Sequence, residues 1–327
     1  MPRFLILSVF ICVHLWLIPP ASAQPKPVPR VQAVPQPYDQ VSFQQGGIEI
    51  ARFHFGNTLK RPFVFPVIGP SGAPLTRMGH PHDPVGHSHH NSVWIAHNDV
   101  NGVSFWADRG KNTGTIVHQR IEKLTDGDTE ASVTSLNHWI DDATKKVLLV
   151  ERRKTTVSPL PPGEGPGVRG EWLLLLDLQL ESKEAVTLGK TPFGIVAVRM
   201  AKSIGVNDGG GTIRNSGGAV NEKEVFWKPA KWVDYSGAIK DKTVEGITLF
   251  DHPSNPNHPS VFHVRNDGWM GSSLTFAEPR KIEPGKSLRL RYGVYVHAGM
   301  PSVEALEARW SAFAKAELVD LTPAKKK

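Results

Sequence analysis

The histidines of this chain gather in one short segment, which is the first place where the residue types indicate chemistry. Six of the fourteen histidines fall between positions 80 and 97. Imidazole binds divalent metal ions and titrates near neutral pH, so the segment could ligate a metal or transfer protons. Recurring Pro, Gly and Ser predict a loop over 80–90, and a strand follows over 92–96. The clustered histidines are His80, His82, His87, His89, His90 and His97.

Three interpretations of this loop stay open on the sequence alone. As acid/base groups, His89, His90 and His97 would exchange protons with a substrate. As metal ligands, the candidates are His82, His87, His89 and His90, with a divalent metal as the cofactor. A His-rich loop is also compatible with rings that are only hydrogen-bonded. No HExxH pattern is present to choose among these.

A second segment whose residue types indicate chemistry covers 226–265 and is dense in aromatic and polar residues. Aromatic faces beside hydrogen-bonding side chains suit a sugar, since its C–H face stacks and its hydroxyls need donors and acceptors. We therefore expect Asp251 and His252 to act with the histidine loop on a sugar. The alternative is that the tryptophans belong to the core and the DHPxNP stretch is only a turn. The substrate-binding candidates are Arg77, Asp99, Trp227, Trp232, Asp234, Tyr235, Asn255, His263 and Arg265.

These segments must be positioned by strands, because short β-type runs separated by Gly, Asn, Asp and Pro clusters recur from residue 41 onward. The pattern predicts an all-β fold, a large antiparallel β-sandwich of the supersandwich type. One C-terminal helix is expected over 302–316, where Val303, Leu306, Trp310 and Phe313 recur at helical spacing. Residues 158–170 are rich in Pro and Gly and predict an excursion between two strands.

The ends of the chain differ in composition from its middle. Residues 1–23 join Arg3, an apolar run and an Ala-Ser-Ala triplet, as a secretory signal does, so we expect a periplasmic or secreted protein. Cleavage would remove Cys12, the only cysteine, and leave no membrane span, because no comparable apolar run follows. The expected divisions are a signal peptide at 1–23, a proline-rich linker at 24–40, one sandwich domain at 41–317 and a basic tail at 318–327.

The charge of the chain indicates no nucleic-acid partner. The formal net charge of +7 falls to +3 once Arg3 and the three terminal lysines are set aside. No stripe of Lys and Arg with interleaved aromatics stands elsewhere in the sequence. A carbohydrate is the partner that the residue types favour.

Several motifs in order resemble a known family. They are Arg61-Pro62-Phe63, Leu75-Thr76-Arg77, His89-His90 with Ser92-Val93-Trp94, His97-Asn98-Asp99, Phe105-Trp106, Trp232-Val233-Asp234-Tyr235 and Asp251-His252-Pro253. Over residues 45–316 the chain resembles the exported bacterial family labelled "methane oxygenase PmoA". The resemblance implies an exported β-rich protein, with a looser likeness to galactose-mutarotase-like sandwiches. The label implies a metal-dependent oxidoreductase, but membrane methane monooxygenase subunits need apolar spans that this chain lacks.

Three functions follow as hypotheses. The first is acid/base chemistry on a sugar, of epimerase, mutarotase or lyase type. The second is a carbohydrate-binding module without catalysis. The third is the metal-dependent oxidoreductase that the family label suggests. The order of the segments in the sequence leaves open whether the 80–99 loop and the 227–265 segment share one cleft.

Overall fold

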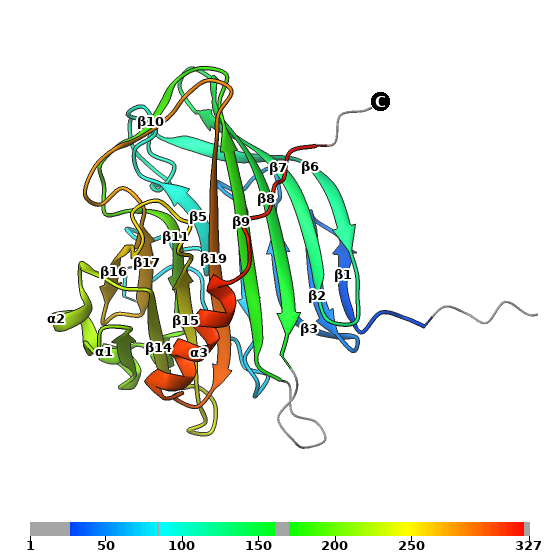
Figure 1. Cartoon of the computed structure of the whole chain (residues 1–327), viewed down its shortest axis with the longest axis vertical. Coiled ribbons are helices and arrows are strands. Elements are labelled where there is room, and N and C mark those ends of the chain that lie inside the picture. The colour runs from blue at the N-terminus through cyan, green and yellow to red at the C-terminus, as the bar shows by residue number, and fades with distance from the viewer. Residues whose placement is uncertain (1–26, 81, 84, 161–169, 324–327) are drawn as a thin grey trace, which may run out of the picture.

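The molecule is built from two large sheets packed face to face, which confirms the predicted all-β sandwich (Figure 1). The computed structural model describes residues 27–80, 82–83, 85–160 and 170–323. Neighbouring strands in each sheet run antiparallel, as expected for short strands joined by tight turns. The predicted signal peptide and Cys12 lie outside the described residues. Within the described residues, no helix combines the length and the apolar character that crossing a bilayer requires.

The first sheet carries nine strands within the described residues. In their order across the sheet they are β1 (Val31–Gln36), β2 (Gln40–Gln45), β3 (Ile48–His54), β4 (Phe63–Val67), β5 (Val93–His97), β11 (Gly194–Arg199), β17 (Trp269–Ser273), β16 (Val261–Arg265) and β13 (Lys228–Pro229).

The second sheet carries eight strands within the same described ranges. In order they are β12 (Thr212–Asn215), β14 (Trp232–Ala238), β15 (Val244–Asp251), β19 (Ser287–Ala298), β9 (Trp172–Glu181), β8 (Val147–Pro159), β7 (Ala131–Asp141) and β6 (Gly114–Thr125). A separate pair joins β10 (Val186–Leu188) to β18 (Arg280–Ile282). Short helical segments are a 3₁₀ turn at Lys202–Ile204, α1 (Val206–Gly209) and α2 (Asn221–Val225), and the C-terminal helix is α3 (Val303–Ala314).

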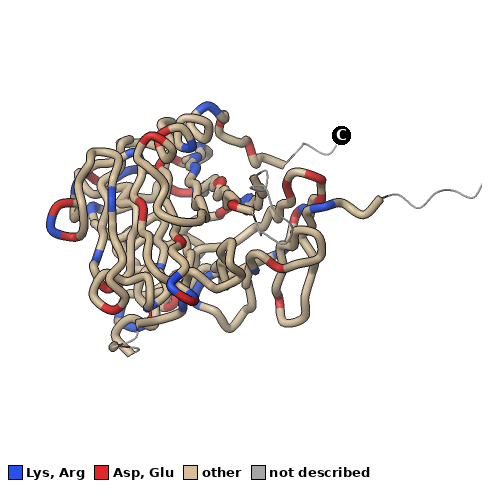
Figure 2. The backbone as a smooth tube through the Cα atoms, turned by 90° about the horizontal axis from the view of Figure 1, so that it is seen from below, with Lys and Arg blue, Asp and Glu red and all other residues tan. Residues whose placement is uncertain are grey.

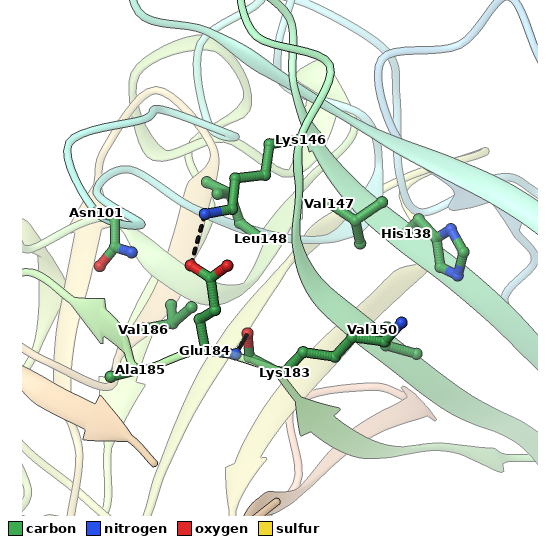
Figure 3. Close-up of a pocket in the computed structure, with 11 residues that line it drawn as sticks. Asn101, His138, Lys146, Val147, Leu148, Val150, Lys183, Glu184, Ala185 and Val186 are labelled. Carbon is green, nitrogen blue, oxygen red and sulfur yellow. Dashed lines mark hydrogen bonds and ion pairs between the residues drawn. The ribbon is translucent and has the colours of Figure 1, made fainter. Parts of the chain in front are cut away.

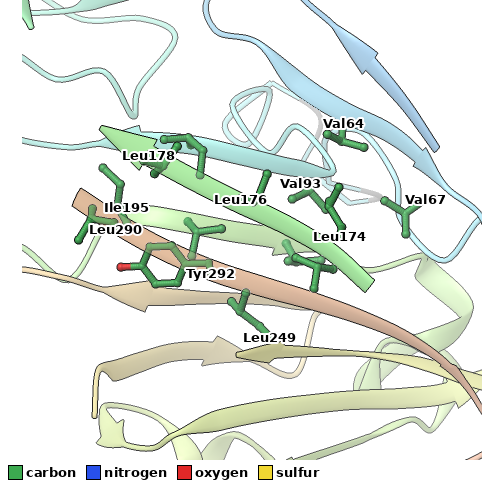
Figure 4. Close-up of a cluster of buried hydrophobic side chains, with 14 of the residues drawn as sticks. Val64, Val67, Val93, Leu174, Leu176, Leu178, Ile195, Leu249, Leu290 and Tyr292 are labelled. Atoms are coloured by element: carbon green, nitrogen blue, oxygen red, sulfur yellow. The ribbon is translucent and has the colours of Figure 1, made fainter. Parts of the chain in front are cut away.

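The main core lies between the two sheets. Figure 4 shows Val64 and Val93 of the first sheet facing Leu174, Leu176 and Leu178 of β9. Because side chains alternate along a strand, these leucines share one face of β9. Burying one such side chain fully contributes about 1.5–3 kcal/mol.

Helix α3 confirms the predicted C-terminal helix and covers the outer face of the second sheet (Figure 1). The Ser302 hydroxyl accepts a hydrogen bond from the Ala305 N–H and begins the helix. Leu306 and Phe313 then pack with Trp232 and Phe250 in a second apolar cluster. Leu173 and Leu175 of β9 join this cluster, so β9 is apolar on both faces because both are covered.

Two boundary predictions need correction. Val31–Gln36, expected in the proline-rich linker of 24–40, form β1, with Val31 and Ala33 buried. Pro35 argues against a strand when the sequence is taken alone, but β1 is an edge strand, where proline is tolerated. In the predicted tail, the Leu321 N–H donates to Gln179 on β9, while the terminal lysines Lys325–Lys327 lie outside the described residues. Of the excursion predicted at 158–170, Ser158 and Pro159 belong to β8, and residues 161–169 lie outside the described residues.

Charged residues of both signs are mixed over the described loops (Figure 2). Several of these charges form surface pairs, such as Lys146 with Glu184 and Arg289 with Asp320. Exposed pairs of this kind contribute little to stability.

A histidine and tryptophan cavity as the candidate functional site

A cavity of about 480 Å³, open to solvent, lies on the outer face of the first sheet. Strand β5 shows which face this is. Val93 and Ile95 point into the main core, so Trp94 between them points the other way. Trp94 joins a separate apolar cluster with Trp106 and Trp269, both of which line the cavity. The lining residues are His87, His89, His90, Asn98, Trp106, Phe193, His263, Arg265, Asp267 and Trp269.

Buried Arg61 ties together two of the loops that form this cavity. Its side chain is 1% exposed and donates to the carbonyl oxygens of Phe105 (3.2 Å) and Trp106 (3.0 Å). It also donates to the side chains of Asn91 (2.6 Å) and Asp108 (2.7 Å). Asn91 follows the histidine loop directly, so one guanidinium fixes that loop against the segment carrying Trp106.

Aromatic rings form the floor and walls. The rings of Trp94 and Trp106 lie 5.4 Å apart, and those of Trp106 and Trp269 lie 5.9 Å apart, measured between centroids. His90 stacks on Trp94 at 5.4 Å, and His263 stacks on Trp269 at 4.3 Å. Each imidazole is therefore held by a tryptophan face, in the stacked geometry that aromatic pairs favour.

The cavity histidines differ from most others in their hydrogen bonding. Most histidines of the described chain use a ring nitrogen in a hydrogen bond to another protein group. Within the described residues, the rings of His89, His90, His138 and His263 make no such bond, and the buried Nδ1 atoms of His90 and His263 are left without a partner. Three of these four rings line the same cavity. Buried polar atoms usually have a partner, so these rings are the ones available to a ligand.

The carboxylate of Asp267 is held by two partners behind the cavity. Fully buried Arg199 donates to its Oδ1 atom at 3.0 Å, and the His80 Nε2–H donates to Oδ2 at 2.9 Å. Burial alone would raise the pKa of Asp267, but Arg199 and His80 outweigh it and hold the pKa below its ordinary value. Asp267 therefore stays ionised and in a fixed position.

Burial keeps the cavity imidazoles neutral. Desolvation, with a smaller contribution from nearby Arg61, lowers the pKa of His89 to about 4. Desolvation and Arg265 lower the pKa of His263 to about 4, and the pKa of His90 is also lowered, chiefly by burial. At neutral pH these rings are unprotonated, so they can accept hydrogen bonds and act as weak bases, but they are not imidazolium acids.

Because these histidines are neutral in the folded protein, we expect the protein to lose stability at mildly acid pH. The pKa values of buried His97 and His263 are lowered to about 4 in the folded chain, against about 6.5 when unfolded. The unfolded chain then binds more protons below pH 6.5, so stability is complete above that pH and falls towards pH 4. We expect each of these two histidines to lower the free energy of unfolding by about 2 kcal/mol between pH 7 and pH 5, or about 4 kcal/mol together, measured by urea denaturation. A His97→Gln/His263→Gln variant with the same pH slope would contradict this origin.

The structure brings part of the predicted site together. His89, His90, His263 and Arg265 all line the cavity, as does the metal candidate His87. The 80–90 loop and strand β16 thus meet at one place although 170 or so residues separate them in the sequence, as expected for strands paired across a sheet.

Five other predicted residues lie close to the cavity or its loop without lining it. The Trp227 ring lies 6.1 Å from that of His263. Arg77 is half-buried near Arg199, and burial together with Arg199 lowers its pKa. His97 is buried, its Nε2–H donating to Thr275 (2.9 Å) and its Nδ1 accepting from the Asp99 N–H, so a catalytic role for His97 is not supported. Asp99 accepts from the Gly102 N–H in a turn, and the exposed His82 pairs with Asp208.

The remaining candidates belong to the second sheet and its connections, so they do not share a site with the histidine loop. Asp234 and Tyr235 are fully buried on β14, and Trp232 packs under α3 with its Nε1–H donating to Glu307. Their polar atoms are used within the protein, so they cannot reach a ligand in the cavity.

The proposed catalytic pair at the end of β15 is likewise structural. Asp251 accepts from His258 (2.7 Å) and from the Ser260 N–H (2.9 Å), and Asn255 donates to it at 2.8 Å. His252 donates to the Ala316 carbonyl at 2.8 Å. The turn interpretation of the DHPxNP stretch is thus the correct one, because its polar groups brace the connection from β15 to β16.

Comparison with known proteins identifies the family. A model of a family of unknown function, DUF6807, matches residues 40–311. The chain belongs to this family. No curated protein matches it. Among solved structures, a TPR-domain containing protein from Parabacteroides distasonis ATCC 8503 is similar at 11% identity with a TM-score of 0.32. That match covers 89% of this chain, which spans about half (51%) of the other protein.

The histidine loop of this DUF6807 member does not assemble a metal centre from described residues. Within the described ranges, no three His, Cys, Asp or Glu side chains are grouped as metal ligands would be. His82 and His87 are paired with the carboxylates of Asp208 (2.8 Å) and Asp83 (2.9 Å). His89 and His90 meet edge-on, with ring centroids 4.5 Å apart. The described side chains therefore do not fit a divalent metal.

Five residues that line the cavity were not among the candidates predicted from the sequence. They come from turns and strand ends that pair only in the folded chain: Asn98, Trp106, Phe193, Asp267 and Trp269. One local signal was available, since Asn266-Asp267-Gly268 is a hairpin turn sequence. This turn pairs Arg265 with Trp269, so a hairpin prediction would have placed Trp269 beside the site.

A second cavity, of about 260 Å³, lies near the β7–β8 turn (Figure 3). Few of its lining residues have side chains that could act on a ligand. Its walls include Val147, Leu148 and Val186, and Lys146 pairs with Glu184 at 2.5 Å across it. His138 is its one histidine among the described residues. The cavity lined by histidines and tryptophans is therefore the candidate functional site.

Proposed function

We propose that this protein is an exported carbohydrate-active protein that holds a sugar in the histidine and tryptophan cavity and performs acid/base chemistry on it. The observation that carries the proposal is the gathering of His89, His90 and His263, whose rings make no hydrogen bond within the described residues, beside Trp106 and Trp269, which also line the cavity. Sugar C–H faces stack on such rings, and sugar hydroxyls pair with neutral imidazoles. A volume of about 480 Å³ lies in the usual range for small-molecule sites.

The charges of the cavity support an uncharged ligand. Asp267 is paired with Arg199, and Arg265 is paired with Glu222 at 3.1 Å. Both charged lining residues thus have an opposite charge beside them. A neutral polar molecule adds no further charge to this arrangement, whereas an isolated ionic ligand would need a counter-charge.

The histidines and the single carboxylate of the cavity suit proton abstraction better than glycoside hydrolysis. A neutral imidazole such as His90 would take a proton from a hydroxyl or from a carbon beside a carbonyl, as epimerase, mutarotase and lyase chemistry requires. Glycoside hydrolysis commonly uses two carboxylates, and Asp267 is the single carboxylate among the described lining residues.

The test compares cavity histidines with a matched histidine elsewhere. His90→Gln and His263→Gln should each weaken sugar binding, and turnover should fall about 10²-fold or more. His138→Gln is the control, because His138 also lacks a ring hydrogen bond within the described residues but lines the other cavity. Binding is measured by calorimetry against a panel of mono- and oligosaccharides, and turnover by NMR of the same sugars. Unchanged binding and turnover in both cavity variants would refute the proposal.

The second candidate function is sugar binding without catalysis. It is favoured by the pKa values of His89 and His263, lowered to about 4, since these rings supply no imidazolium acid at neutral pH. Binding lost in His90→Gln, with no turnover of any sugar by the wild-type protein, would select it. The oxidoreductase suggested by the resemblance to the family labelled "methane oxygenase PmoA" requires stoichiometric metal, which elemental analysis of untagged protein would reveal.

A further inference from the structure

Trp227 is an exposed aromatic residue held in an unusual backbone conformation beside the cavity. Its side chain is 45% exposed, and its φ of 57° lies in the left-handed region, where a bulky residue is a genuine outlier. The Trp227 N–H donates to the Phe262 carbonyl of β16 at 2.9 Å, which fixes this conformation. Strained residues of this kind persist only where the surrounding structure holds them, and they cluster at functional sites.

The Trp227 ring belongs to an aromatic platform. It stacks on Phe226 with centroids 4.5 Å apart and planes 22° from parallel, and Phe276 lies 5.5 Å away. The segment that carries Phe226 and Trp227 joins α2 to β13, the last strand of the first sheet, next to β16; α2 and β16 are labelled in Figure 1. The rings of the platform are packed against one another, so the exposed Trp227 is presented in a fixed position.

The platform is continuous with the cavity through strand β16. The rings of Phe226 and His263 meet edge-on at 4.8 Å, and His263 lines the cavity. Arg265, which also lines the cavity, places its guanidinium 5.7 Å from the Phe226 ring centre. A molecule that leaves the cavity past His263 and Arg265 therefore meets the Trp227 platform next.

We infer that the ligand is an oligosaccharide, with one sugar unit in the cavity and the adjacent unit stacked on Trp227. This inference rests on the proposed function and adds the chain length of the ligand. The next sugar would place its C–H face on the indole, while Arg265 and its partner Glu222 supply a donor and an acceptor for hydroxyls at the junction. Trp227 is thus a specificity residue for longer sugars and takes no part in proton transfer.

The experiment measures affinity as a function of chain length. Gluco-, manno-, xylo- and galacto-oligosaccharides of one to six units are titrated into the full-length protein by calorimetry. For the sugar series that binds, wild-type affinity should rise about tenfold or more from one unit to two or three. Trp227→Ala should remove this gain, a loss of about tenfold, and leave the affinity for the single unit unchanged.

Two further variants keep the test specific. Trp227→Phe should retain part of the gain, because a smaller ring still stacks. Tyr38→Ala is the matched control, since Tyr38 is 90% exposed with a φ of 63° but lies at the β1–β2 turn. Its affinities should equal those of the wild-type protein.

The remaining outcomes overturn the inference in distinguishable ways. Equal affinity for single units and longer chains, or a Trp227→Ala loss that is the same at every length, refutes it and leaves the proposed function standing. Binding of no sugar in the panel refutes both. If gel filtration instead shows wild-type self-association that Trp227→Ala abolishes, the platform is a protein contact and the inference fails.

Discussion

Replacement of Arg61 by alanine is expected to lower the free energy of unfolding by about 3–5 kcal/mol and to abolish ligand binding in the cavity. The guanidinium is buried and pairs with Asp108, and removing one partner of a buried ion pair leaves the other uncompensated. Two backbone carbonyls, of Phe105 and Trp106, would also lose their donor. The loop carrying His89 and His90 would no longer be tied to the segment carrying Trp106.

The control for this prediction is Arg291→Ala. Arg291 is also buried and donates to Asp177 at 2.6 Å, but it lies on β19 of the second sheet. Both variants should be destabilised in urea titrations, whereas only Arg61→Ala should lose sugar binding at low temperature, where the folded form predominates. Normal binding by folded Arg61→Ala would show that the loops keep their positions without it.

Replacement of Asp234 by asparagine is expected to cost about 3–5 kcal/mol of stability while the folded protein keeps its ligand affinity. The buried carboxylate accepts from Arg214 (2.6 Å), His297 (2.9 Å), Ser236 (2.9 Å) and Thr248 (3.0 Å). A neutral amide leaves the Arg214 guanidinium without its counter-charge and replaces one acceptor oxygen by a donor group. This variant separates a structural role for Asp234 from the sugar-binding role that its residue type suggested.

The pH dependence of the same variant provides a second measurement. Burial alone would raise the pKa of Asp234, but His297 and Arg214 more than offset this and hold the pKa below its ordinary value. Its contribution to stability is therefore complete above the unfolded pKa of about 3.9 and is lost as the pH falls through the lower folded pKa. The stability difference between wild type and Asp234→Asn should shrink below pH 4. A constant difference down to pH 2, or sugar binding lost in the folded variant, would contradict this account.

The sequence was sufficient to predict the fold class and one half of the site. Alternating strands and frequent turns define a sandwich, and the histidine loop and β16 carry residues whose types indicate a ligand site. It was not sufficient to decide which strand faces are covered. Trp232 and Trp227 look alike in sequence, yet Trp232 is buried beneath α3 and Trp227 is exposed.

The polar residues of the second segment show the same limit. Asp234 and Asp251 were candidates because carboxylates beside aromatics suit sugars, but their partners come from distant strands and loops. His297 is 63 positions from Asp234 in sequence and 2.9 Å from it in space. Only the pairing of β14, β15 and β19 reveals that this carboxylate is already neutralised.

On strand β5, Val93 and Ile95 pack into the core between the sheets, whereas Trp94 packs into the aromatic layer beneath the cavity. Because alternate residues of one strand serve the two faces, the packing that holds the sheets together and the surface that meets a ligand are encoded at different positions. Substitutions can therefore alter the residues that face the cavity while the positions that hold the sandwich together stay the same.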